Sequence, residues 1–330
     1  MKKILTVIGT RPQYIKLDKN LDQIILDTNQ HYSNGLQNDL FFKELGLPKP
    51  DYELGETKLP NMIKKIISVI KKEKPDIVQV FGDTRSTLAG AIAAHEMNVP
   101  IAHVEAGMRC GRRDMPEERI RIIVDHMSAW LFCPTITAMK NLEEERIREN
   151  VFLSGNVMFD TFSACCPVAK RKDHGTYSYL SIHRQETVES KVRLEGIMEG
   201  VAGDEKIIFP AHPRTVKQLE LFKIAIPKNV KIIKPMKYKD NINLISGARR
   251  VLTDSGGVQN EAYWMLIPCG ILRRETEWPD YVRDGWNSLV DADPTDIKLF
   301  LNKRIKSGES HNAMPQFGAK QKIRDILMNV

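Results

Sequence analysis

The sequence predicts an α/β protein of two domains, each with a parallel sheet covered by helices on both faces. At 330 residues, the chain has the length of about two domains. Short, nearly continuous apolar runs alternate with helical patterns, which is typical of parallel strands buried on both sides. Hydrophobic residues make up 42% of the chain and charged residues 28%, so two cores can be filled.

Two series of predicted strands are separated by a stretch without clean periodicity. The first series lies at 4–8, 23–26, 77–81, 101–104, 131–133 and 151–153. The second lies at 177–182, 206–210, 230–233, 251–253, 267–271 and 288–290. Helices are expected between them, including 61–72, 86–97 and 116–130. We therefore expect an N-terminal domain over 1–160, a linker over 161–176 and a C-terminal domain over 177–330, which includes a terminal helix at 320–330.

Charge and cysteine content exclude several classes of protein. The formal net charge is +7, but the basic residues are dispersed and no aromatic–basic repeat suggests base stacking, so we expect no nucleic-acid partner. No apolar run reaches the roughly 18 residues of a membrane span. Five cysteines without metal-ligand spacing, and no secretory signal, predict a reducing, cytoplasmic location.

The turn after the predicted strand 251–253 is the most informative segment. Ser255, Gly256 and Gly257 lie between a strand and a helix, where bare backbone N–H groups suit a phosphate or diphosphate. Glu261 lies less than two turns into that helix, within reach of a ribose hydroxyl. The alternative is an ordinary strand-to-helix turn with glycines for close packing.

Other polar residues follow the strands or begin the helices in both halves. In open α/β sheets, ligands bind beyond the carboxyl ends of the strands, so two such domains suggest a cleft between them. Taken singly, each residue is equally compatible with a helix cap, a salt bridge or a structural histidine. The candidates are Arg11, Lys16, Asp83, Glu105, Arg109, Glu117, His183, Arg184, His212, Arg273 and Arg274.

Three carboxylates in the N-terminal half suit proton transfer at carbon, namely Asp83, Glu105 and Glu117. Glu105 ends a hydrophobic strand, so it must be paired, protonated or functional. Cationic donors beside these acids would stabilise a departing diphosphate. The chain has neither a Gly-x-Gly-x-x-Gly nor a Walker loop, and no His/Cys/Asp cluster. We therefore expect no redox cofactor, no ATP and no metal.

Eight motifs occur in the order seen in non-hydrolysing UDP-N-acetylglucosamine 2-epimerases, and together they cover nearly the whole chain. The resemblance implies a GT-B fold, with two Rossmann-like doubly wound domains facing a central cleft. It also implies a homodimeric isomerase of polysaccharide biosynthesis that needs no cofactor. The motifs are Gly9-Thr-Arg-Pro-Gln13, Gly82-Asp-Thr84, His103-Val-Glu-Ala-Gly107, Pro116-Glu-Glu118, Gly155-Asn156, His183-Arg184, His212-Pro-Arg-Thr215 and Asp254-Ser-Gly-Gly-Val-Gln259.

The resemblance also implies a mechanism and a set of roles. UDP leaves C1 as the C2 proton is lost, and UDP adds back after protonation on the other face. Acid/base work falls to Asp83, Glu105 and Glu117, with His183 at the leaving diphosphate. The substrate-binding candidates are Arg11, Lys16, Arg109, Arg184, His212, Ser255, Gly256, Gly257, Glu261 and Arg273.

Departures from the family pattern concern the sugar. Gln13 and the stretches 275–278 and 285–287 look like UDP-2,3-diacetamido-2,3-dideoxyglucuronate 2-epimerases. A sugar carboxylate would need a cation, for which Arg109, Arg273 and Arg274 are candidates. We narrowly favour the uronate over UDP-N-acetylglucosamine. The first helix, expected at 16–21, has about half the family's length, and the segment after Tyr52 is also shorter.

Three competing functions remain open on the same scaffold. A GT-B glycosyltransferase would share the diphosphate turn but would not need three carboxylates around C2. A hydrolysing 2-epimerase would release the free sugar and UDP. A degenerate nucleotide-sugar-binding protein would keep the fold without turnover.

Overall fold

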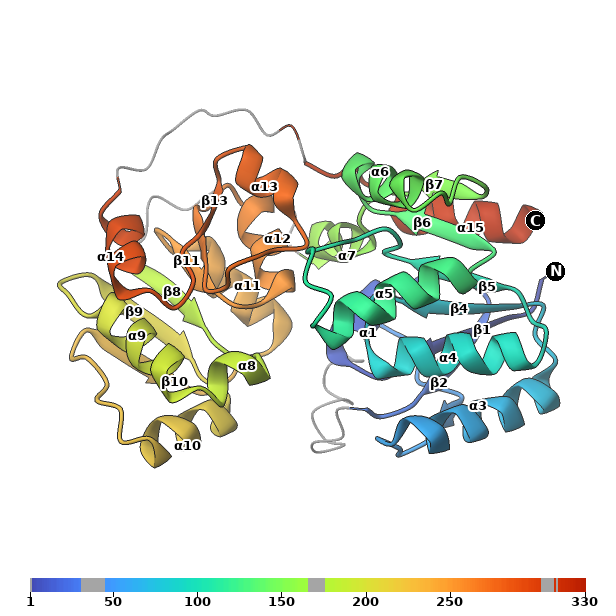
Figure 1. Cartoon of the computed structure of the whole chain (residues 1–330), viewed down its shortest axis with the longest axis horizontal. Coiled ribbons are helices and arrows are strands. Elements are labelled where there is room, and N and C mark those ends of the chain that lie inside the picture. Colours follow the sequence, from blue (N-terminus) through green and yellow to red (C-terminus); the bar gives the residue numbers. More distant parts are fainter. Residues whose placement is uncertain (1, 31–44, 166–175, 304–311, 313) are drawn as a thin grey trace. The chain divides into compact units, whose positions relative to one another are not determined.

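The computed structural model describes residues 2–30, 45–165, 176–303, 312 and 314–330. The chain divides into two compact units (Figure 1). Unit 1 comprises Met1–Cys165 and Pro315–Val330, and unit 2 comprises Cys166–Met314. Among the described residues, no helix is both long enough and apolar enough to cross a membrane.

Unit 1 contains a seven-stranded parallel sheet in the order β3-β2-β1-β4-β5-β6-β7. The first predicted strand series is confirmed, whereas β3 is only two residues long and was missed. The chain runs outward from β1 in both directions, so the ends of β1 and β4 mark the switch point where open α/β sheets bind ligands. The strands are β1 (Ile4–Ile8), β2 (Gln23–Asp27), β3 (Tyr52–Glu53), β4 (Ile77–Phe81), β5 (Ile101–Val104), β6 (Trp130–Cys133) and β7 (Val151–Leu153).

Helices cover both faces of this sheet, as the buried strands require. Apolar side chains of α3 (Leu59–Glu73), α4 (Arg85–Glu96) and α5 (Pro116–Met127) share one core with the strands. The opposite core holds side chains of α1 (Arg11–Lys16), α7 (Val157–Cys165) and α15 (Ala319–Asn329). The remaining helix, α6 (Ile136–Glu144), lies beside β6 and β7 (Figure 1).

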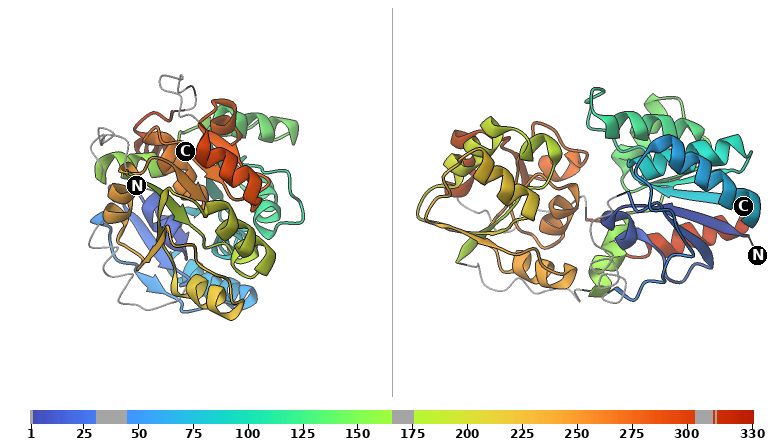
Figure 2. Two further views of the ribbon diagram at one scale, coloured as in Figure 1. Left: turned by 90° about the vertical axis from the view of Figure 1, so that its left-hand side faces the viewer. Right: turned by 90° about the horizontal axis from the view of Figure 1, so that it is seen from below.

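The C-terminal helix α15 belongs to unit 1, so our assignment of 320–330 to the C-terminal domain was wrong. Ala319, Ile323 and Leu327 are buried in the same core as β1, and Figure 2 shows α15 in red beside the strands of unit 1. Three apolar residues at helical spacing do not say which sheet they cover. The predicted linker also began too early, because α7 continues to Cys165; residues 166–175 lie outside the described part.

The first helix ends at Lys16, where we had expected it to lie at 16–21. Thr10 precedes it as N-cap and Pro12 lies in its first turn, where the missing proline N–H costs no hydrogen bond. The backbone of Leu17 leaves the helical region at φ −57° and ψ 136°. The helix is therefore six residues long, and Lys16 is its last residue.

Unit 2 contains a six-stranded parallel sheet in the order β10-β9-β8-β11-β12-β13, which confirms the second strand series. Side chains of α9, α10 and α14 fill a core on one face, and α11, α12 and α13 lie toward the other (Figure 1). The strands are β8 (Tyr177–Ser181), β9 (Lys206–Pro210), β10 (Val230–Ile233), β11 (Val251–Thr253), β12 (Cys269–Ile271) and β13 (Asn287–Leu289). The helices are α8 (Gln185–Val188), α9 (Lys191–Val201), α10 (Pro213–Leu221), α11 (Tyr238–Ser246), α12 (Gly256–Trp264), α13 (Pro279–Arg283) and α14 (Pro294–Asn302).

Candidate active site

A buried ion pair joins Lys16 and Glu105 at the switch point of unit 1. Lys16 Nζ lies 2.5 Å from Glu105 Oε2, and their side chains are only 8% and 7% exposed. Glu105 has φ +69°, a left-handed conformation that is costly for a residue with a side chain. A Cβ on Gly82 would lie 3.1 Å from Glu105 Oε2 and 3.4 Å from Lys16 Nζ, so glycine leaves room for the pair. We expected Glu105 to be paired, protonated or functional, and the structure shows that it is paired, with Lys16.

A second ion pair holds Asp83, which follows β4. Arg121 Nη2 lies 2.5 Å from Asp83 Oδ2, and Arg121 Nη1 donates to the backbone oxygen of Glu105 at 3.4 Å. One guanidinium therefore links the turns after β4 and β5, which carry two of the three predicted acids. Sequence reasoning missed Arg121, because nothing in the pattern of α5 separates it from a solvated arginine.

The structure distinguishes the two neighbouring acids at the start of α5. Glu118 accepts from the backbone N–H groups of Cys110 and Gly111 at 3.0 and 2.9 Å, so its carboxylate organises that loop. Glu117 is partly exposed and lies four residues before Arg121, on the same face of the helix. Our prediction of Glu117 as the third acid is compatible with this placement.

A buried histidine and aspartate support the two turns. His103 Nε2 lies 2.8 Å from Gly82 O, and Nδ1 lies 2.6 Å from Asp125 Oδ1. Both ring nitrogens therefore face oxygen atoms, and the ring links the turn after β4 to α5. Asp125 also accepts from Gly107 N–H and from Arg109. Burial raises the pKa of Asp125, but His103 and Arg109 outweigh it and hold the pKa below its usual range.

Arg109, predicted to bind substrate, is engaged by two carboxylates. Its Nη1 lies 2.8 Å from Asp125 Oδ2, and its Nε and Nη2 donate to Glu145 at 2.7 and 2.8 Å. Nη1 also donates to Met108 O. These contacts stabilise the loop after β5, and a substrate contact by Arg109 stays a prediction.

Gln13 joins the turn after β1 to the turn after β4. Its Oε1 accepts from the N–H groups of Gly9 and Thr10 at 2.9 and 3.2 Å. Its Nε2 donates to Phe81 O at 2.8 Å and to Thr84 Oγ1 at 3.1 Å. The side chain is buried at 1% exposure, so it orders two loops and does not face a sugar. Gln13 is one of the residues that look like the uronate subgroup, and its bearing on the choice of sugar stays a prediction.

In unit 2, Asp254 orders the backbone beside the turn that is predicted to bind the diphosphate. Its fully buried carboxylate accepts from the N–H groups of His183 and Arg184 at 3.1 and 3.0 Å. His183 Nδ1 lies 3.1 Å from Asp254 Oδ1, while its side chain is 53% exposed. Burial raises the pKa of Asp254, but its contacts with His183 and Arg184 hold it below its usual range. Nδ1 is therefore engaged, and Nε2 is left for a ligand.

The strand–turn–helix predicted at 251–262 is confirmed. Ser255 is the N-cap of α12, and its Oγ accepts from Val258 N–H at 3.4 Å. The first N–H groups of a helix have no acceptor within it, which leaves those of Gly256 and the next glycine for an anion. A Cβ on Gly256 would meet only Trp278 Nε1, at 3.8 Å, so the approach to this turn is open. Diphosphate binding at Ser255, Gly256 and Gly257 stays a prediction.

Glu261 is a buried acid on α12. Its side chain is 4% exposed, and burial raises its pKa to about 8 although a hydrogen bond with Tyr238 lowers it. The carboxyl group is therefore largely protonated at neutral pH and can both donate and accept a hydrogen bond. That chemistry fits the predicted contact with a ribose hydroxyl.

The arginines proposed for a sugar carboxylate have acidic partners in the structure. Arg273 is 1% exposed and its Nη1 lies 2.9 Å from Glu277 Oε2, with Glu275 at 3.4 Å. Burial lowers its pKa, but these acids raise it further, above its usual range. Arg274 Nε lies 2.8 Å from Asp291 Oδ2. These positive charges are already compensated within unit 2.

Arg11, Arg184 and His212 lie at helix N-termini. Arg11 is the exposed first residue of α1 in unit 1. In unit 2, Arg184 is the N-cap of α8, and its Nη2 lies 3.4 Å from a Glu277 oxygen. His212 is the N-cap of α10, where Nδ1 accepts from Arg214 N–H at 3.2 Å. Their contacts with substrate stay predictions.

Comparison with known proteins decides the family. The family model for UDP-N-acetylglucosamine 2-epimerase matches residues 13–328. This chain belongs to the UDP-N-acetylglucosamine 2-epimerase family. Its sequence is 40% identical over 342 residues to UDP-N-acetylglucosamine 2-epimerase of Methanocaldococcus jannaschii, covering 92% of this chain and 93% of the relative.

Two further comparisons define the fold and the subgroup. The crystal structure of the M. jannaschii UDP-GlcNAc 2-epimerase in complex with UDP-GlcNAc and UDP matches with a TM-score of 0.90 and 37% identity, over 99% of this chain and all of that one. UDP-2,3-diacetamido-2,3-dideoxy-D-glucuronate 2-epimerase of Pseudomonas aeruginosa is 40% identical over 317 residues, 88% of each chain. The GT-B fold of this 2-epimerase family member is confirmed, as is its likeness to the uronate subgroup. Members of the family are isomerases, which separates this chain from the glycosyltransferases that share its fold.

Proposed function

We propose that the chain inverts C2 of a UDP-linked 2-acetamido sugar by eliminating UDP and adding it back. One observation carries this proposal beyond family membership. Two acids at adjacent strand ends of unit 1 each face a cation at 2.5 Å, Glu105 with Lys16 and Asp83 with Arg121. A carboxylate that a cation holds in place can accept a proton from a bound substrate.

The C2 proton of an N-acetylhexosamine is only weakly acidic, so its loss must accompany departure of UDP from C1. A carboxylate of unit 1 takes the proton, the C1–O bond breaks with its electron pair on the diphosphate, and an enol ether remains. Protonation on the opposite face and return of UDP complete the inversion. Asp83, Glu105 and Glu117 supply the acid and the base. Their order of action is part of the proposal.

Unit 2 supplies the groups for the leaving diphosphate. The N-terminus of α12 presents N–H groups and a partial positive charge, which favour an anion. His183 is held at Nδ1 by Asp254, which directs Nε2 away from that contact, and as an imidazolium the ring would donate from Nε2 to a diphosphate oxygen. Glu261, the predicted ribose contact, lies on the same helix.

For the sugar, we propose UDP-N-acetylglucosamine. The uronate requires an uncompensated cation, and Arg109, Arg273 and Arg274 each have carboxylate partners. Relatives acting on either sugar share 40% identity with this chain, so identity does not separate them. A cation pairing with a sugar carboxylate is worth about 1.5–3 kcal/mol, which corresponds to roughly ten- to a hundredfold in kcat/KM.

Incubation with each UDP-sugar in deuterium oxide tests the proposal. We expect deuterium at C2 in both epimers while UDP stays attached. Free sugar with UDP would indicate a hydrolase, and no exchange with either substrate would contradict the epimerase. A higher kcat/KM for the uronate would overturn the choice of sugar alone.

We further propose a homodimer that supplies activated sugars for polysaccharide synthesis in the cytoplasm. The family resemblance supports this, and light scattering on the purified protein tests the dimer.

A further inference from the structure

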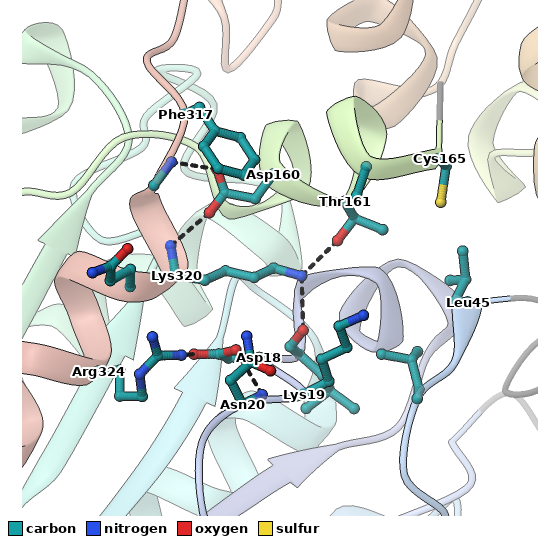
Figure 3. Close-up of a pocket in the computed structure, with 15 residues that line it drawn as sticks. Asp18, Lys19, Asn20, Leu45, Asp160, Thr161, Cys165, Phe317, Lys320 and Arg324 are labelled. Carbon is teal, nitrogen blue, oxygen red and sulfur yellow. Dashed lines mark hydrogen bonds and ion pairs between the residues drawn. The ribbon is translucent and has the colours of Figure 1, made fainter. Parts of the chain in front are cut away.

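Lys320, on the C-terminal helix α15, makes three hydrogen bonds at the end of the first helix. Its Nζ donates to Ile15 O at 3.0 Å and to Leu17 O at 2.7 Å. It also donates to Thr161 Oγ1 at 2.5 Å (Figure 3). Thr161 in turn donates to Ile15 O at 2.6 Å. An ammonium group has three donors, so every one of them is used here.

The two backbone oxygens that Lys320 holds flank Lys16. Lys16 is the last residue of α1, and the final carbonyl groups of a helix have no acceptor role within it. A cation at this end satisfies them and also interacts favourably with the helix dipole. In this chain α1 is only six residues long, so Lys320 takes the place of the helical turn that would otherwise follow.

Two contacts fix Lys320 itself. Asp160 of α7 accepts from the backbone N–H groups of Gly318 and Lys320 at 2.8 and 2.7 Å, which caps the start of α15. One turn further along the helix, Arg324 Nη1 lies 2.5 Å from Asp18 Oδ2. All of these residues belong to unit 1. The C-terminal helix is thus tied to the end of α1 by side chains as well as by its apolar face.

We infer that Lys320 is a positioning residue for the acid/base site: by holding the backbone on both sides of Lys16, it sets the place of the Lys16 ammonium against Glu105. The inference rests on the proposed function, in which Glu105 transfers the C2 proton. It assigns a role to a residue over 300 positions away in the sequence from the one that it positions.

Substitution of Lys320 tests this role against a matched control. Lys320→Met removes the three donors and keeps the aliphatic stem, whereas Lys322→Met alters the next exposed lysine of α15, which contacts Leu153 O at the end of β7. Because small misplacements of catalytic groups are costly, we expect Lys320→Met to lower kcat for C2 exchange by about ten- to a hundredfold. Lys322→Met should change kcat less than about twofold, and Lys320→Arg should recover most of the loss.

The titration of Lys320 gives a readout that a general loss of stability would not produce. Burial lowers its pKa to about 8, although Asp160 and Asp18 raise it. Cys165 of α7 also raises the pKa of the Lys320 amine, whereas Lys19 lowers it. Lys320 also lines a cavity of about 230 Å³. Above pH 8 the amine loses one donor, whereas an arginine at this position stays protonated.

The ratio of the Lys320→Arg rate to the native rate should therefore rise by at least about threefold between pH 7 and 9.5, since other titrating groups cancel in the ratio. This comparison uses only the native protein and Lys320→Arg, so it does not depend on the folding of Lys320→Met. A ratio that stays flat, or a folded Lys320→Met with native kcat, would overturn the inference. Failure of the proposed function would look different, because the native protein itself would then show no C2 exchange.

Discussion

The strand ends of unit 1 and unit 2 hold their functional groups in different ways. In unit 1, buried polar side chains face one another, as in the Lys16–Glu105 ion pair and the contact of His103 with Asp125. In unit 2, backbone N–H groups at the start of α12 and a half-exposed His183 face outward. The acids of unit 1 are therefore part of its stability, whereas the diphosphate turn of unit 2 is open and contributes little to packing.

This difference has a physical reason. A carboxylate that takes a proton from carbon must be held in place with its charge balanced, and a nearby cation does both. A site that holds a diphosphate and releases it in every cycle gains more from fixed N–H dipoles, which need no reorganisation. We therefore expect activity and stability to be coupled in unit 1 and separable in unit 2.

Replacement of Glu105 by Gln should have the largest effect. It removes a proposed acid/base group, so the rate of C2 exchange should fall by about two to four orders of magnitude. It also leaves Lys16 buried without its partner, which should lower the free energy of unfolding by about 3–5 kcal/mol. Exchange measured in deuterium oxide and urea unfolding test both losses.

The control for this change is Glu144→Gln, an exposed acid on α6 that should alter neither quantity. A Glu105→Gln protein with native stability would break the proposed coupling in unit 1. One with native C2 exchange would remove Glu105 from the acid/base set.

Asp254→Asn should have the next largest effect, because Asp254 of unit 2 is a fully buried carboxylate that accepts several hydrogen bonds. The amide keeps one acceptor oxygen for the two N–H groups, but it replaces the other oxygen, which faces Nδ1 of His183, with an NH2 group that cannot accept. We expect kcat to fall by about ten- to a hundredfold and stability by about 1–3 kcal/mol, the usual cost of an unsatisfied buried group.

Acid unfolding checks the electrostatic part of this effect. The folded pKa of Asp254 lies below its ordinary value, so its stabilisation is present above the unfolded value of about 3.9 and is lost as the pH falls through the folded pKa. The Asn variant should lose less stability than the native protein between pH 5 and 2. Equal losses would show that Asp254 carries no such stabilisation.

Much of the fold and part of the site followed from the sequence. Strands such as β1 and β4 are nearly continuous apolar runs, and the turn at 254–257 carries its own signal in Ser255 and two glycines. The carboxylates at 83 and 105 were chosen as candidates because each lies within two residues of the end of a strand. These features are local, so the pattern of neighbouring residues is enough to reveal them.

What could not be predicted depends on contacts between distant segments. Arg121 and Asp125 face inward only because α5 packs over β4 and β5, and their own sequence context is that of an ordinary amphipathic helix. The C-terminal helix was assigned to the wrong unit for the same reason. Lys320 and Ile15 are 305 positions apart in the sequence, and no pattern of neighbouring residues predicts their contact.

Gly256→Val should separate binding from stability in unit 2. The added side chain would project into the approach to the diphosphate turn, and its Cβ meets only Trp278 Nε1 at 3.8 Å. We expect UDP affinity to fall by at least about tenfold. The melting temperature should change by only a few degrees, because valine is a somewhat better helix former than glycine and its Cβ would make only an ordinary contact. Calorimetry with UDP and thermal unfolding measure the two quantities. Unchanged affinity would contradict the placement of the diphosphate.

Glu261→Gln should have the smallest effect, seen only in the pH dependence of stability. The folded pKa of about 8 exceeds the ordinary value of 4.5, so the folded protein binds this proton more tightly than the unfolded chain. The resulting stability is complete below pH 4.5 and is lost as the pH rises through 8. Glutamine stays neutral, so the variant should match the native protein at pH 5 and exceed it by about 1–3 kcal/mol at pH 9.

Urea unfolding of both proteins at pH 5, 7 and 9 measures this difference. Lys320 also titrates near pH 8, but it does so in both proteins and cancels in the comparison. Because the Glu261 carboxyl group is buried, charging it costs desolvation free energy, which the hydrogen bond with Tyr238 only partly offsets. Parallel stability curves for the two proteins would mean that Glu261 is already ionised in the folded state. Glu261 would then resemble the paired acids of unit 1, and the contrast between the two units would not extend to the ribose contact.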